Sequence, residues 1–381
     1  MALGPEEEVR SAGADAPLRT SSGPTSEHAD AVPLPVPSGA GQVYAGPVPQ
    51  SAPPPVAELH VHVEGTLEAE MAFELAARNG VRLPFADAAE LRSRYAFGDL
   101  QSFLDLYYAC SAVLRTEDDF ADLAAAYLRR ASSDGVRHAE IFFDPQAHTD
   151  RGVPLEAVVG GLWAVVESSE AQLGVSASLI PCFLRDRGPD AAMGTLGALL
   201  AHRDRFVGVG LDSAEVGHPP SLFADVFARA RAEGLHCVAH AGEEGPAAYV
   251  WEALDVLRVE RIDHGVRCME DPDLVRRLRD EQVPLTVCPL SNVRLGVVER
   301  IDDHPLAEML ASGLAVTVNS DDPAYFGGYV GDNFTAAAAL GLGPADLHRL
   351  AGNSLRAAFV PDDRRAVLLA ELGSGPGSTA A

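Results

Sequence analysis

Short apolar runs rich in β-branched residues alternate along the chain with longer segments in which apolar residues recur every three or four positions. The first pattern predicts buried β-strands, and the second predicts amphipathic α-helices. Because the short runs are apolar throughout, they favour parallel strands that are covered by helices. Eight strands are predicted, at residues 59–63, 136–143, 177–183, 206–211, 236–240, 261–263, 285–288 and 315–319.

The helical pattern is clearest at residues 69–79, 116–132, 155–172, 222–232 and 273–279. Asn79-Gly80, Asp134-Gly135 and Glu233-Gly234 are typical of helix ends, where glycine adopts a left-handed conformation. Eight strand–helix alternations favour an α/β fold of the (β/α)8 TIM-barrel type. A doubly wound open sheet is the main alternative. It is disfavoured because the sequence has neither G-x-G-x-x-G after the first strand nor a G-x-x-x-x-G-K-[ST] motif.

Residues 67–135 separate the first two predicted strands and predict a helical insertion after strand 1. Within the insertion, residues 99–108 form an amphipathic aromatic pattern, which predicts either a lid or wall over a site or a helix packed on the barrel rim. Residues 1–56 are rich in Pro, Gly, Ala and Ser without periodicity, and they predict a disordered tail. A second disordered tail is predicted at residues 371–381, which leaves a barrel domain at residues 57–370.

The composition narrows the class of partner. The chain has 29 Lys and Arg against 55 Asp and Glu, a net charge of −26, which repels nucleic acid and is compatible with a small-molecule substrate. Its five cysteines are widely spread without a C-x-x-C pair, so neither a disulfide framework nor a cysteine zinc site is expected. No apolar run reaches the ~18 residues of a membrane span, and the N-terminus is acidic rather than basic and apolar. We therefore expect a soluble, cytoplasmic protein.

Polar residues with metal-binding chemistry follow several of the predicted strands. His60 and His62 alternate along the first strand and therefore share one face. His240 ends the fifth strand, and Asp321 follows the eighth. Because the carboxyl ends of barrel strands converge, these side chains are expected to surround one ion. Three imidazoles and one carboxylate suit Zn²⁺, with Fe²⁺ or Mn²⁺ as alternatives.

Three further residues are candidates for acid–base chemistry. Glu243 follows His240 after a turn glycine, so its carboxyl group can face the metal site and move protons. The neighbouring Glu244 is its nearest competitor for that role. His264 ends the sixth strand and is placed to orient or deprotonate a water, whereas the preceding Asp263 is expected to point away. Asp322 follows Asp321, and the adjacent charge favours its protonated form, which can donate a hydrogen bond to substrate.

These residues lie in motifs that resemble those of the adenosine/adenine deaminase family of zinc hydrolases. The motifs occur in the family's order from about residue 58 to residue 359. They are His60-x-His62, His240-Ala-Gly-Glu243, Ile262-Asp-His264-Gly265, Cys288-Pro-Leu-Ser291-Asn292 and Ser320-Asp-Asp322-Pro323. Unrelated nucleobase deaminases combine H-x-E with P-C-x-x-C, and the sequence lacks that combination because it contains no P-C-x-x-C.

The resemblance implies a role for each matching residue. His60, His62, His240 and Asp321 would bind zinc. Glu243 would protonate the purine at N1, His264 would position the attacking hydroxide, and Asp322 would contact N7. Addition at C6 and loss of ammonia would then give a 6-oxopurine.

Within that family, the sequence is more similar to members that act on adenine than to those that act on adenosine. Glu64 stands where adenosine deaminases typically have a shorter aspartate directed at the ribose, and a longer acid would narrow that space. The alternative for Glu64 is a helix cap or a residue that supports other side chains of the site. Tyr325 and Phe326 are expected to wall a pocket for a bare base, and Ser213 and Glu215 are candidates for reading the purine edge. The expected reaction is zinc-dependent deamination of adenine to hypoxanthine and ammonia in purine salvage.

Three other functions remain as alternatives. One is the same reaction on adenosine or another N9-substituted adenine. A second is hydrolysis of a non-purine substrate by a metal-dependent amidohydrolase. Such enzymes commonly bridge two metals with a lysine, and no motif here centres on one. The third is a purine-binding protein without catalysis, which loss of Glu243 or of a metal ligand would have supported.

Overall fold

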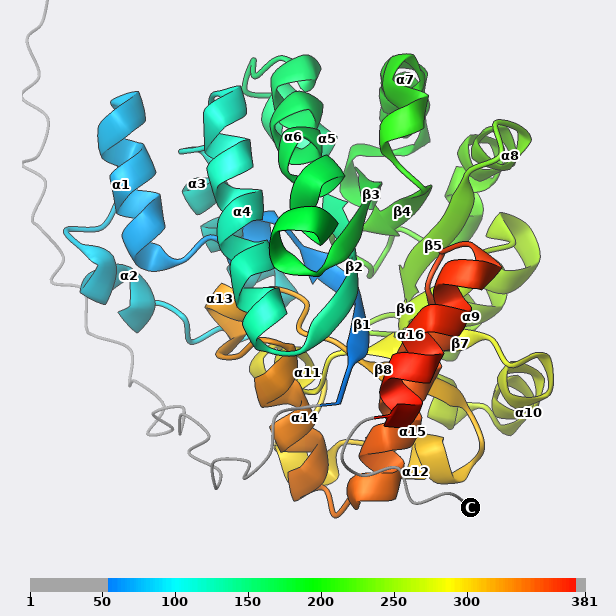
Figure 1. Ribbon diagram of the computed structural model, residues 1–381. Helices are drawn as coiled ribbons and strands as arrows, with labels where there is room; N and C mark the ends of the chain where they lie inside the picture. The colour runs from blue at the N-terminus through cyan, green and yellow to red at the C-terminus, as the bar shows by residue number, and fades with distance from the viewer. Residues whose placement is uncertain (1–53, 375–381) are drawn as a thin grey trace, which may run out of the picture. The chain divides into compact units, whose positions relative to one another are not determined.

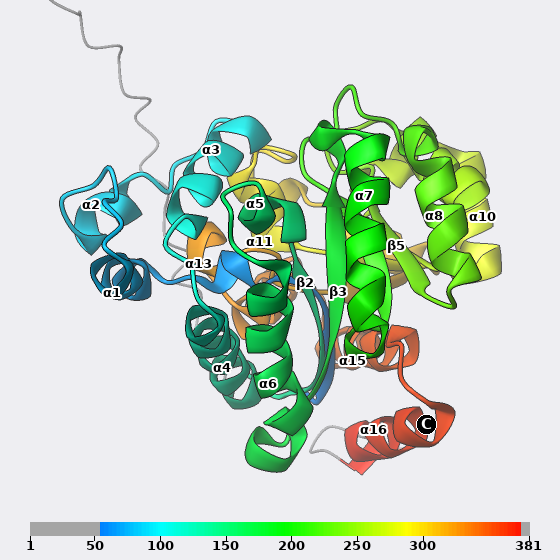
Figure 2. The ribbon, with the colours of Figure 1, turned by 90° about the horizontal axis from the view of Figure 1, so that it is seen from above.

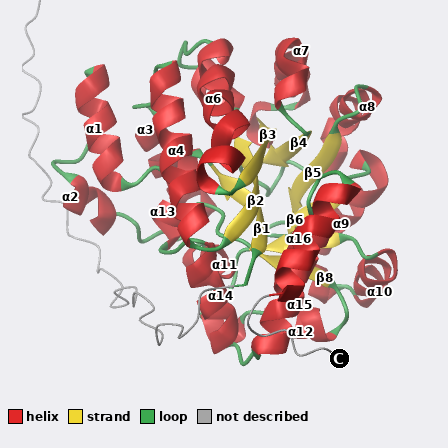
Figure 3. Ribbon diagram, in the orientation of Figure 1, coloured by secondary structure: helices red, strands yellow, loops and turns green. Residues whose placement is uncertain are grey.

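The computed structural model describes residues 54–374 and contains eight parallel β-strands arranged in sequential order from β1 to β8 (Figures 1 and 3). This confirms the predicted TIM barrel. The predicted tails are residues 1–56 and 371–381. Most of both tails, residues 1–53 and 375–381, lies outside the described residues. At those boundaries β1 begins at Val56, and the last helix, α16, ends at Ser374.

All eight predicted strands are present, and their boundaries differ from the predicted ones by a few residues. The strands are β1 (Val56–His62), β2 (Val136–Phe143), β3 (Ser176–Leu184), β4 (Gly208–Asp212), β5 (His236–Ala241), β6 (Arg261–His264), β7 (Pro284–Val287) and β8 (Ala315–Val318). Every neighbouring pair from β1–β2 to β7–β8 is parallel. Because all strands point the same way, their carboxyl ends lie at one end of the barrel.

The barrel closes between β1 and the segment that follows β8. The Asp321 N–H donates to the His60 carbonyl at 3.0 Å, and the His62 N–H donates to the Asp321 carbonyl at 3.0 Å. The two potential metal ligands on β1, His60 and His62, are thus joined by backbone hydrogen bonds to a further potential ligand, Asp321. The backbone hydrogen bonds that close the barrel therefore also bring these three residues together.

Helices surround the sheet on its outer side (Figure 3). The α-helices are α1 (Ala69–Asn79), α2 (Ala88–Ser93), α3 (Leu100–Ser111), α4 (Glu117–Ser133), α5 (Pro145–Thr149), α6 (Leu155–Leu173), α7 (Pro189–Leu199), α8 (Ala224–Ala232), α9 (Ala247–Glu252), α10 (Pro272–Glu281), α11 (Pro289–Arg294), α12 (Leu306–Ala311), α13 (Pro323–Phe326), α14 (Val330–Ala339), α15 (Pro344–Ala357) and α16 (Asp362–Ser374). Among residues 54–374, no helix has the length and apolar character needed to cross a bilayer.

Helix boundaries follow local capping chemistry. Gly80 ends α1 in the left-handed conformation, with φ of 63°, as the Asn79-Gly80 pair predicts. Thr116 caps α4 by accepting a hydrogen bond from the Asp119 N–H. The predicted helix at 222–232 is divided at its start, where a 3₁₀ turn, Pro220–Phe223, precedes α8.

Four helices, α1 to α4, lie between β1 and β2. The longest, α4, packs beside α6 against the outside of β2 and β3, as in an ordinary barrel layer (Figure 2). Helix α3 instead contacts α5 and the turn that follows β1. It therefore reaches the carboxyl end of the barrel, where the candidate site lies.

The barrel interior is layered beneath the site. Phe142, Ile180, Cys182 and Val238 form a buried apolar cluster inside the strands. The Phe142 ring centroid lies 5.2 Å from those of His60 and His62, so its ring forms part of the floor under the histidines. This apolar layer helps to keep water out beneath the polar residues.

Candidate active site

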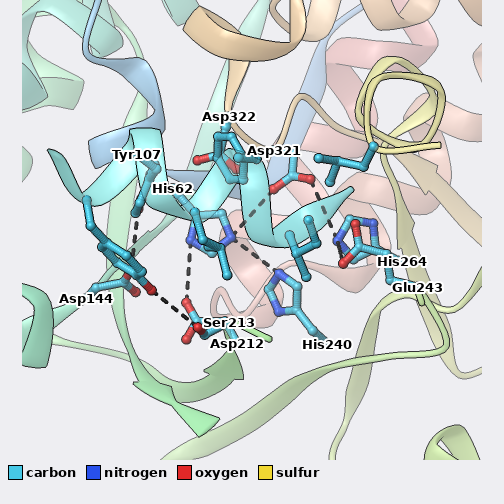
Figure 4. A pocket seen from close by; sticks show the side chains of 15 residues that line it. His62, Tyr107, Asp144, Asp212, Ser213, His240, Glu243, His264, Asp321 and Asp322 are labelled. Carbon is cyan, nitrogen blue, oxygen red and sulfur yellow. Dashed lines mark hydrogen bonds and ion pairs between the residues drawn. The ribbon is translucent and has the colours of Figure 1, made fainter. Parts of the chain in front are cut away.

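The structure brings four potential metal ligands together at the carboxyl ends of β1, β5 and β8. One ligand atom each from His60, His62, His240 and Asp321 lies within 4.8 Å of the other three, and all four residues are buried. His60 Nε2 is 3.2 Å from Asp321 Oδ1, and His62 Nε2 is 3.3 Å from His240 Nε2. Figure 4 shows the last two rings facing each other beside Asp321. The convergence follows from strand alternation and from barrel closure.

Hydrogen bonds to the outer ring nitrogens favour one tautomer in two of the histidines. His240 Nδ1 lies 3.1 Å from the Leu211 carbonyl, which can only accept a hydrogen bond. His60 Nδ1 lies 3.0 Å from Thr286 Oγ1, and that hydroxyl donates to Asp263 at 2.8 Å. Both Nδ1 atoms are therefore donors, which leaves the Nε2 lone pairs directed at the centre of the cluster.

The third histidine has a nearby carboxylate at its outer nitrogen instead of a hydrogen bond. His62 Nδ1 lies 3.6 Å from Asp212 Oδ2, which favours a proton on Nδ1 and a lone pair on Nε2. Lone pairs of His62 and His240 that face each other at 3.3 Å repel unless a cation lies between them. In addition, His60 Nε2 is buried and has no hydrogen-bond partner among the described residues. The residues thus fit a metal ion with nitrogen and oxygen ligands.

Glu243 lies beside this cluster on the loop after β5. Gly242 precedes it with φ of 74°, and the turn directs the Glu243 side chain toward the pocket. Its Oε1 atom is buried and has no partner among residues 54–374. Burial, followed by the charge of Asp321, raises the pKa of Glu243 well above its usual value. A neutral carboxyl group with a free oxygen can donate a proton to a ligand.

His264 lies beside Glu243, at the end of β6 (Figure 4). Its Nε2 atom is 3.5 Å from Glu243 Oε2 and 3.7 Å from Asp321 Oδ2. Its Nδ1 atom is 3.3 Å from the side-chain amide of Asn292, which in turn contacts His304. Burial lowers the pKa of His264 to about 3, so the ring is neutral and its position is held from behind by Asn292.

Asp322 presents a second buried carboxyl group to the pocket. Its Oδ1 atom has no partner among the described residues, and burial, followed by the adjacent charge of Asp321, raises its pKa well above the usual value. Gly65 leaves the space that Asp322 occupies, because a Cβ atom at Gly65 would lie 1.9 Å from Asp322 Oδ1. The close approach of this glycine therefore sets the position of the carboxyl group.

A single pocket contains these polar groups and is covered on one side by α3. Leu100, Phe103, Leu104, Tyr107 and Tyr108 of α3 contribute to its lining. Tyr107 donates to Asp144 at 3.3 Å, and the Tyr108 hydroxyl lies 3.3 Å from Ser213 Oγ. These bonds connect α3 to the ends of β2 and β4 across the pocket, so α3 forms the predicted wall.

Comparison with known proteins agrees with this geometry. The adenosine deaminase family profile matches residues 55–374, which is most of the chain. The chain belongs to the adenosine deaminase family. An adenine deaminase of Streptomyces coelicolor is 64% identical over 323 residues, which are 84% of this chain and 95% of that protein. An adenine deaminase of Cupriavidus necator is 58% identical over 319 residues, which are 84% of this chain and 91% of that protein.

Two solved structures show the same fold. The crystal structure of adenine deaminase from Arthrobacter aurescens matches with a TM-score of 0.83 and 61% identity, covering 84% of this chain and 98% of that one. An amidohydrolase from Burkholderia ambifaria, solved with bound Zn, matches with a TM-score of 0.78 and 29% identity, covering 84% of this chain and 89% of that one.

Three sequence-based expectations about the pocket of this family member are wrong in detail. Tyr325 and Phe326 are not among the residues that line the pocket; they are buried and pack against Phe103 of α3, with ring centroids 5.7 and 4.6 Å from it. Asp263 does not point away from the site, because it accepts from Thr286 beneath the histidines. Glu215 is not exposed to the pocket either.

Glu64 supports other residues of the site, which is one of the two roles expected for it. Its carboxylate contacts His148 Nε2 at 2.7 Å and accepts the Asp144 N–H at 3.1 Å. It therefore holds α5 and the end of β2 instead of lining the pocket itself. Asp144 and Asp212 do line the pocket. The sequence analysis did not single them out, although both directly follow predicted apolar strands.

Proposed function

We propose that this protein is an adenine deaminase that hydrolyses adenine to hypoxanthine and ammonia. The observation that carries the proposal is the pair of buried carboxyl groups, Glu243 and Asp322, whose free oxygens face one pocket beside a potential metal site. The high identity to proteins named adenine deaminase supports the choice of substrate.

His60, His62, His240 and Asp321 would hold the metal ion, and we propose zinc. Three imidazoles and one carboxylate suit zinc, Fe²⁺ and Mn²⁺, and the amidohydrolase relative with bound Zn supports the first of these. Such a cation lowers the pKa of water toward neutrality and so supplies a nucleophile. The chain's own residues then have to bind, orient and protonate the base.

Glu243 would donate its proton to N1 of adenine. Protonation of N1 withdraws electron density from C6 and makes that carbon susceptible to attack. The raised pKa of Glu243 keeps the proton available near neutral pH. His264, neutral and held by Asn292, would orient the attacking water through Nε2.

Asp322 would bind the five-membered ring. Adenine N7 is a hydrogen-bond acceptor, and a carboxyl group can donate to it only when protonated. The raised pKa of Asp322 meets that requirement. With N1 held by Glu243 and N7 held by Asp322, the plane of the purine is fixed and C6 is directed to the metal side of the pocket.

The wall of the pocket favours a free base over a nucleoside. Tyr107 bonds to Asp144, and Tyr108 contacts Ser213, so side chains from α3 are joined to the barrel rim. Glu64 in turn fixes Asp144 through its backbone N–H. A ribose on N9 would have to displace some of these contacts, whereas adenine has only a hydrogen there.

We also propose a cytoplasmic enzyme of purine salvage. All five cysteines lie in the described part of the chain, buried and unpaired, which suits a reducing compartment. The net charge of −26 is unfavourable for binding nucleic acid, so a small purine is the partner that the site and the charge support.

A substrate comparison with ammonia detection tests the proposal. The zinc-loaded protein is incubated with adenine, adenosine and 9-methyladenine, and kcat/KM is measured for each. We expect adenine to be preferred over both by at least about 100-fold, because a buried wall discriminates by unfavourable contacts. Faster turnover of adenosine would overturn the substrate assignment in favour of adenosine deaminase. No ammonia from any of the three would overturn the reaction itself.

A further inference from the structure

Glu215 lies behind the pocket and is enclosed by the backbone of the loop that carries Glu243. Its side chain is buried, with 1% exposed. Its carboxylate accepts hydrogen bonds from four consecutive backbone N–H groups, at 2.7, 3.1, 2.9 and 2.8 Å, in the order Gly242, Glu243, Glu244, Gly245. A run of N–H groups turned toward one anion forms a concave anion-binding backbone arrangement.

These bonds fix the backbone on both sides of Glu243. Oε1 accepts from Gly242, and Oε2 accepts from the next three residues, so both carboxylate oxygens of Glu215 are used. A Cβ atom at Gly245 would lie 2.5 Å from Glu215 Oε1, which shows how closely the loop encloses the carboxylate. Without this anion the four N–H groups, buried at the end of β5, would lose their shared acceptor.

A substrate-binding role for Glu215 does not fit the same observations. Neither oxygen is left without a donor, and Glu215 does not line the pocket. Glu215 is also absent from the group of potential metal ligands. Within the described part of the chain, the hydrogen bonds of its side chain all go to the loop of Glu243.

We propose that Glu215 is a positioning residue that holds the Glu243 carboxyl group at the distance and angle required for proton transfer to the base. The proposal rests on the proposed function of Glu243 as the proton donor. Glu215 follows β4 and Glu243 follows β5, so the carboxylate joins two neighbouring strand ends at the barrel rim. An error of about 1 Å in the position of a catalytic group can cost on the order of 10²-fold in rate.

The test uses Glu215→Gln in the zinc-loaded, full-length enzyme. Glutamine keeps the side-chain volume but has one acceptor oxygen, and its amide N–H groups face the backbone donors. We expect kcat for adenine to fall by about 30- to 100-fold, while KM changes less than about threefold and the metal content stays at the wild-type level. Glu252→Gln is the matched control, because Glu252 also accepts a backbone N–H, from Ser221, outside the pocket. Its kcat should match the wild type.

A double-mutant cycle distinguishes positioning of Glu243 from a general structural role. Glu243→Gln alone should lower kcat by about 10²- to 10⁴-fold. If Glu215 acts through Glu243, adding Glu215→Gln to that variant should cause almost no further loss. Rates are measured by chromatography of hypoxanthine after long incubations. If Glu243→Gln leaves no measurable rate, a crystal structure of Glu215→Gln decides, since the Glu243 carboxyl group must be displaced.

Four results would overturn the proposal. They are an unchanged kcat in Glu215→Gln, a full second loss in the double variant, a loss of metal that accounts for the lost rate, and an undisplaced Glu243 in the crystal structure. In each test the variants are compared with the wild type on a 6-aminopurine that the wild type deaminates. Failure of the wild type to deaminate adenine would overturn the proposed substrate and leave the Glu215 comparison intact.

Discussion

Strained backbone conformations at single residues aim several side chains of the site. Five non-glycine residues among those described have positive φ, and three of them, Ser213, His264 and Asp321, line the pocket, with φ of 70°, 61° and 66°. Such conformations cost of order 1–3 kcal/mol each and persist only where the surroundings enforce them. In Asp321 the enforcing contacts are the two backbone hydrogen bonds that close the barrel. The strained backbone at Asp321 therefore helps to place its carboxylate, a potential metal ligand, in the site.

Gly65 gives a residue-scale prediction about Asp322. Gly65→Ala would place a Cβ atom 2.7 Å from the Asp322 Cα atom, where backbone has to move. We expect kcat/KM for adenine to fall by at least about 100-fold, because the displaced carboxyl group no longer meets N7 while the metal ligands remain. Steady-state kinetics and metal analysis of the purified variant measure both effects.

Gly80→Ala is a matched control with the opposite expected outcome. Gly80 also has a special conformation, with φ of 63°, but a Cβ atom there would meet nothing within 4 Å. The substitution should lower the free energy of unfolding by about 1 kcal/mol and leave kcat/KM unchanged. Equal activities of the two variants would contradict the role given to Gly65.

The sequence predicts the site residues best where periodicity constrains them. His60 and His62 share a face because strands alternate, and His240 and Asp321 follow strands whose ends must converge. The same alternation rule failed for Asp263, because the next residue, His264, ends β6 with a positive φ and so departs from regular strand geometry. Glu215 was wrongly expected to read the purine edge, since its actual partners are backbone N–H groups on another loop, which the sequence does not reveal.

At the scale of elements, α3 shows how a wall is supported from behind. Phe103 is buried among the rings of Phe97, Tyr107, Tyr325 and Phe326, at centroid distances of 4.6 to 5.7 Å. The aromatic pattern at residues 99–108 predicted this helix, and the aspartate cap at Asp99 defines its start. Tyr325 and Phe326, which follow Asp322, lie far from Phe103 in sequence. Because their packing against α3 could not be predicted, they were expected to line the pocket.

Phe103→Ala is expected to loosen this wall. Removing a buried phenyl ring should lower the free energy of unfolding by about 3 kcal/mol and leave α3 less firmly packed. Substrate binding then has to order the helix, so we expect KM for adenine to rise by about tenfold with a smaller change in kcat. Urea unfolding and steady-state kinetics test the two parts of this prediction.

Phe227→Ala in α8 separates wall packing from general stability. Phe227 is fully buried against Phe183, with ring centroids 6.1 Å apart, and does not line the pocket. A similar loss of stability is expected, with KM unchanged. A rise in KM of equal size in both variants would mean that stability, and not the wall, controls KM.

At the scale of the whole molecule, the barrel contains a buried ion pair beneath its apolar interior. Arg261 Nη1 donates to Glu140 Oε2 at 2.6 Å, and both side chains are fully buried. The Arg261 guanidinium also lies 4.6 Å from the centroid of the Phe359 ring. Strand order could be predicted from apolar runs, but this pair could not, because charged residues inside apolar strands carry no periodic signal.

The ion pair makes stability depend on acid pH in a defined direction. Burial alone would raise the pKa of Glu140, but the charge of Arg261, the contact with His138 and the hydrogen bond from the Phe359 N–H together outweigh burial and lower it from 4.5 to about 2. The folded state therefore releases this proton more readily than the unfolded state. Its stabilising effect, about 3 kcal/mol, is complete above the unfolded pKa and is lost as the pH falls from about 4.5 through about 2.

Glu140→Gln tests both the size and the pH dependence of this effect. At pH 7 the substitution leaves Arg261 buried without a charged partner, and we expect the free energy of unfolding to fall by about 3–5 kcal/mol. The difference from the wild type should narrow by about 1 kcal/mol at pH 4, because the unfolded wild type there begins to bind the proton that folded Glu140 still releases. Urea unfolding of metal-free protein at the two pH values measures the difference. Glu371→Gln breaks a partly exposed pair with Arg137 and should change stability by less than about 1 kcal/mol at either pH. A constant difference between Glu140→Gln and the wild type would mean that Glu140 is not stabilised as an anion in the folded barrel.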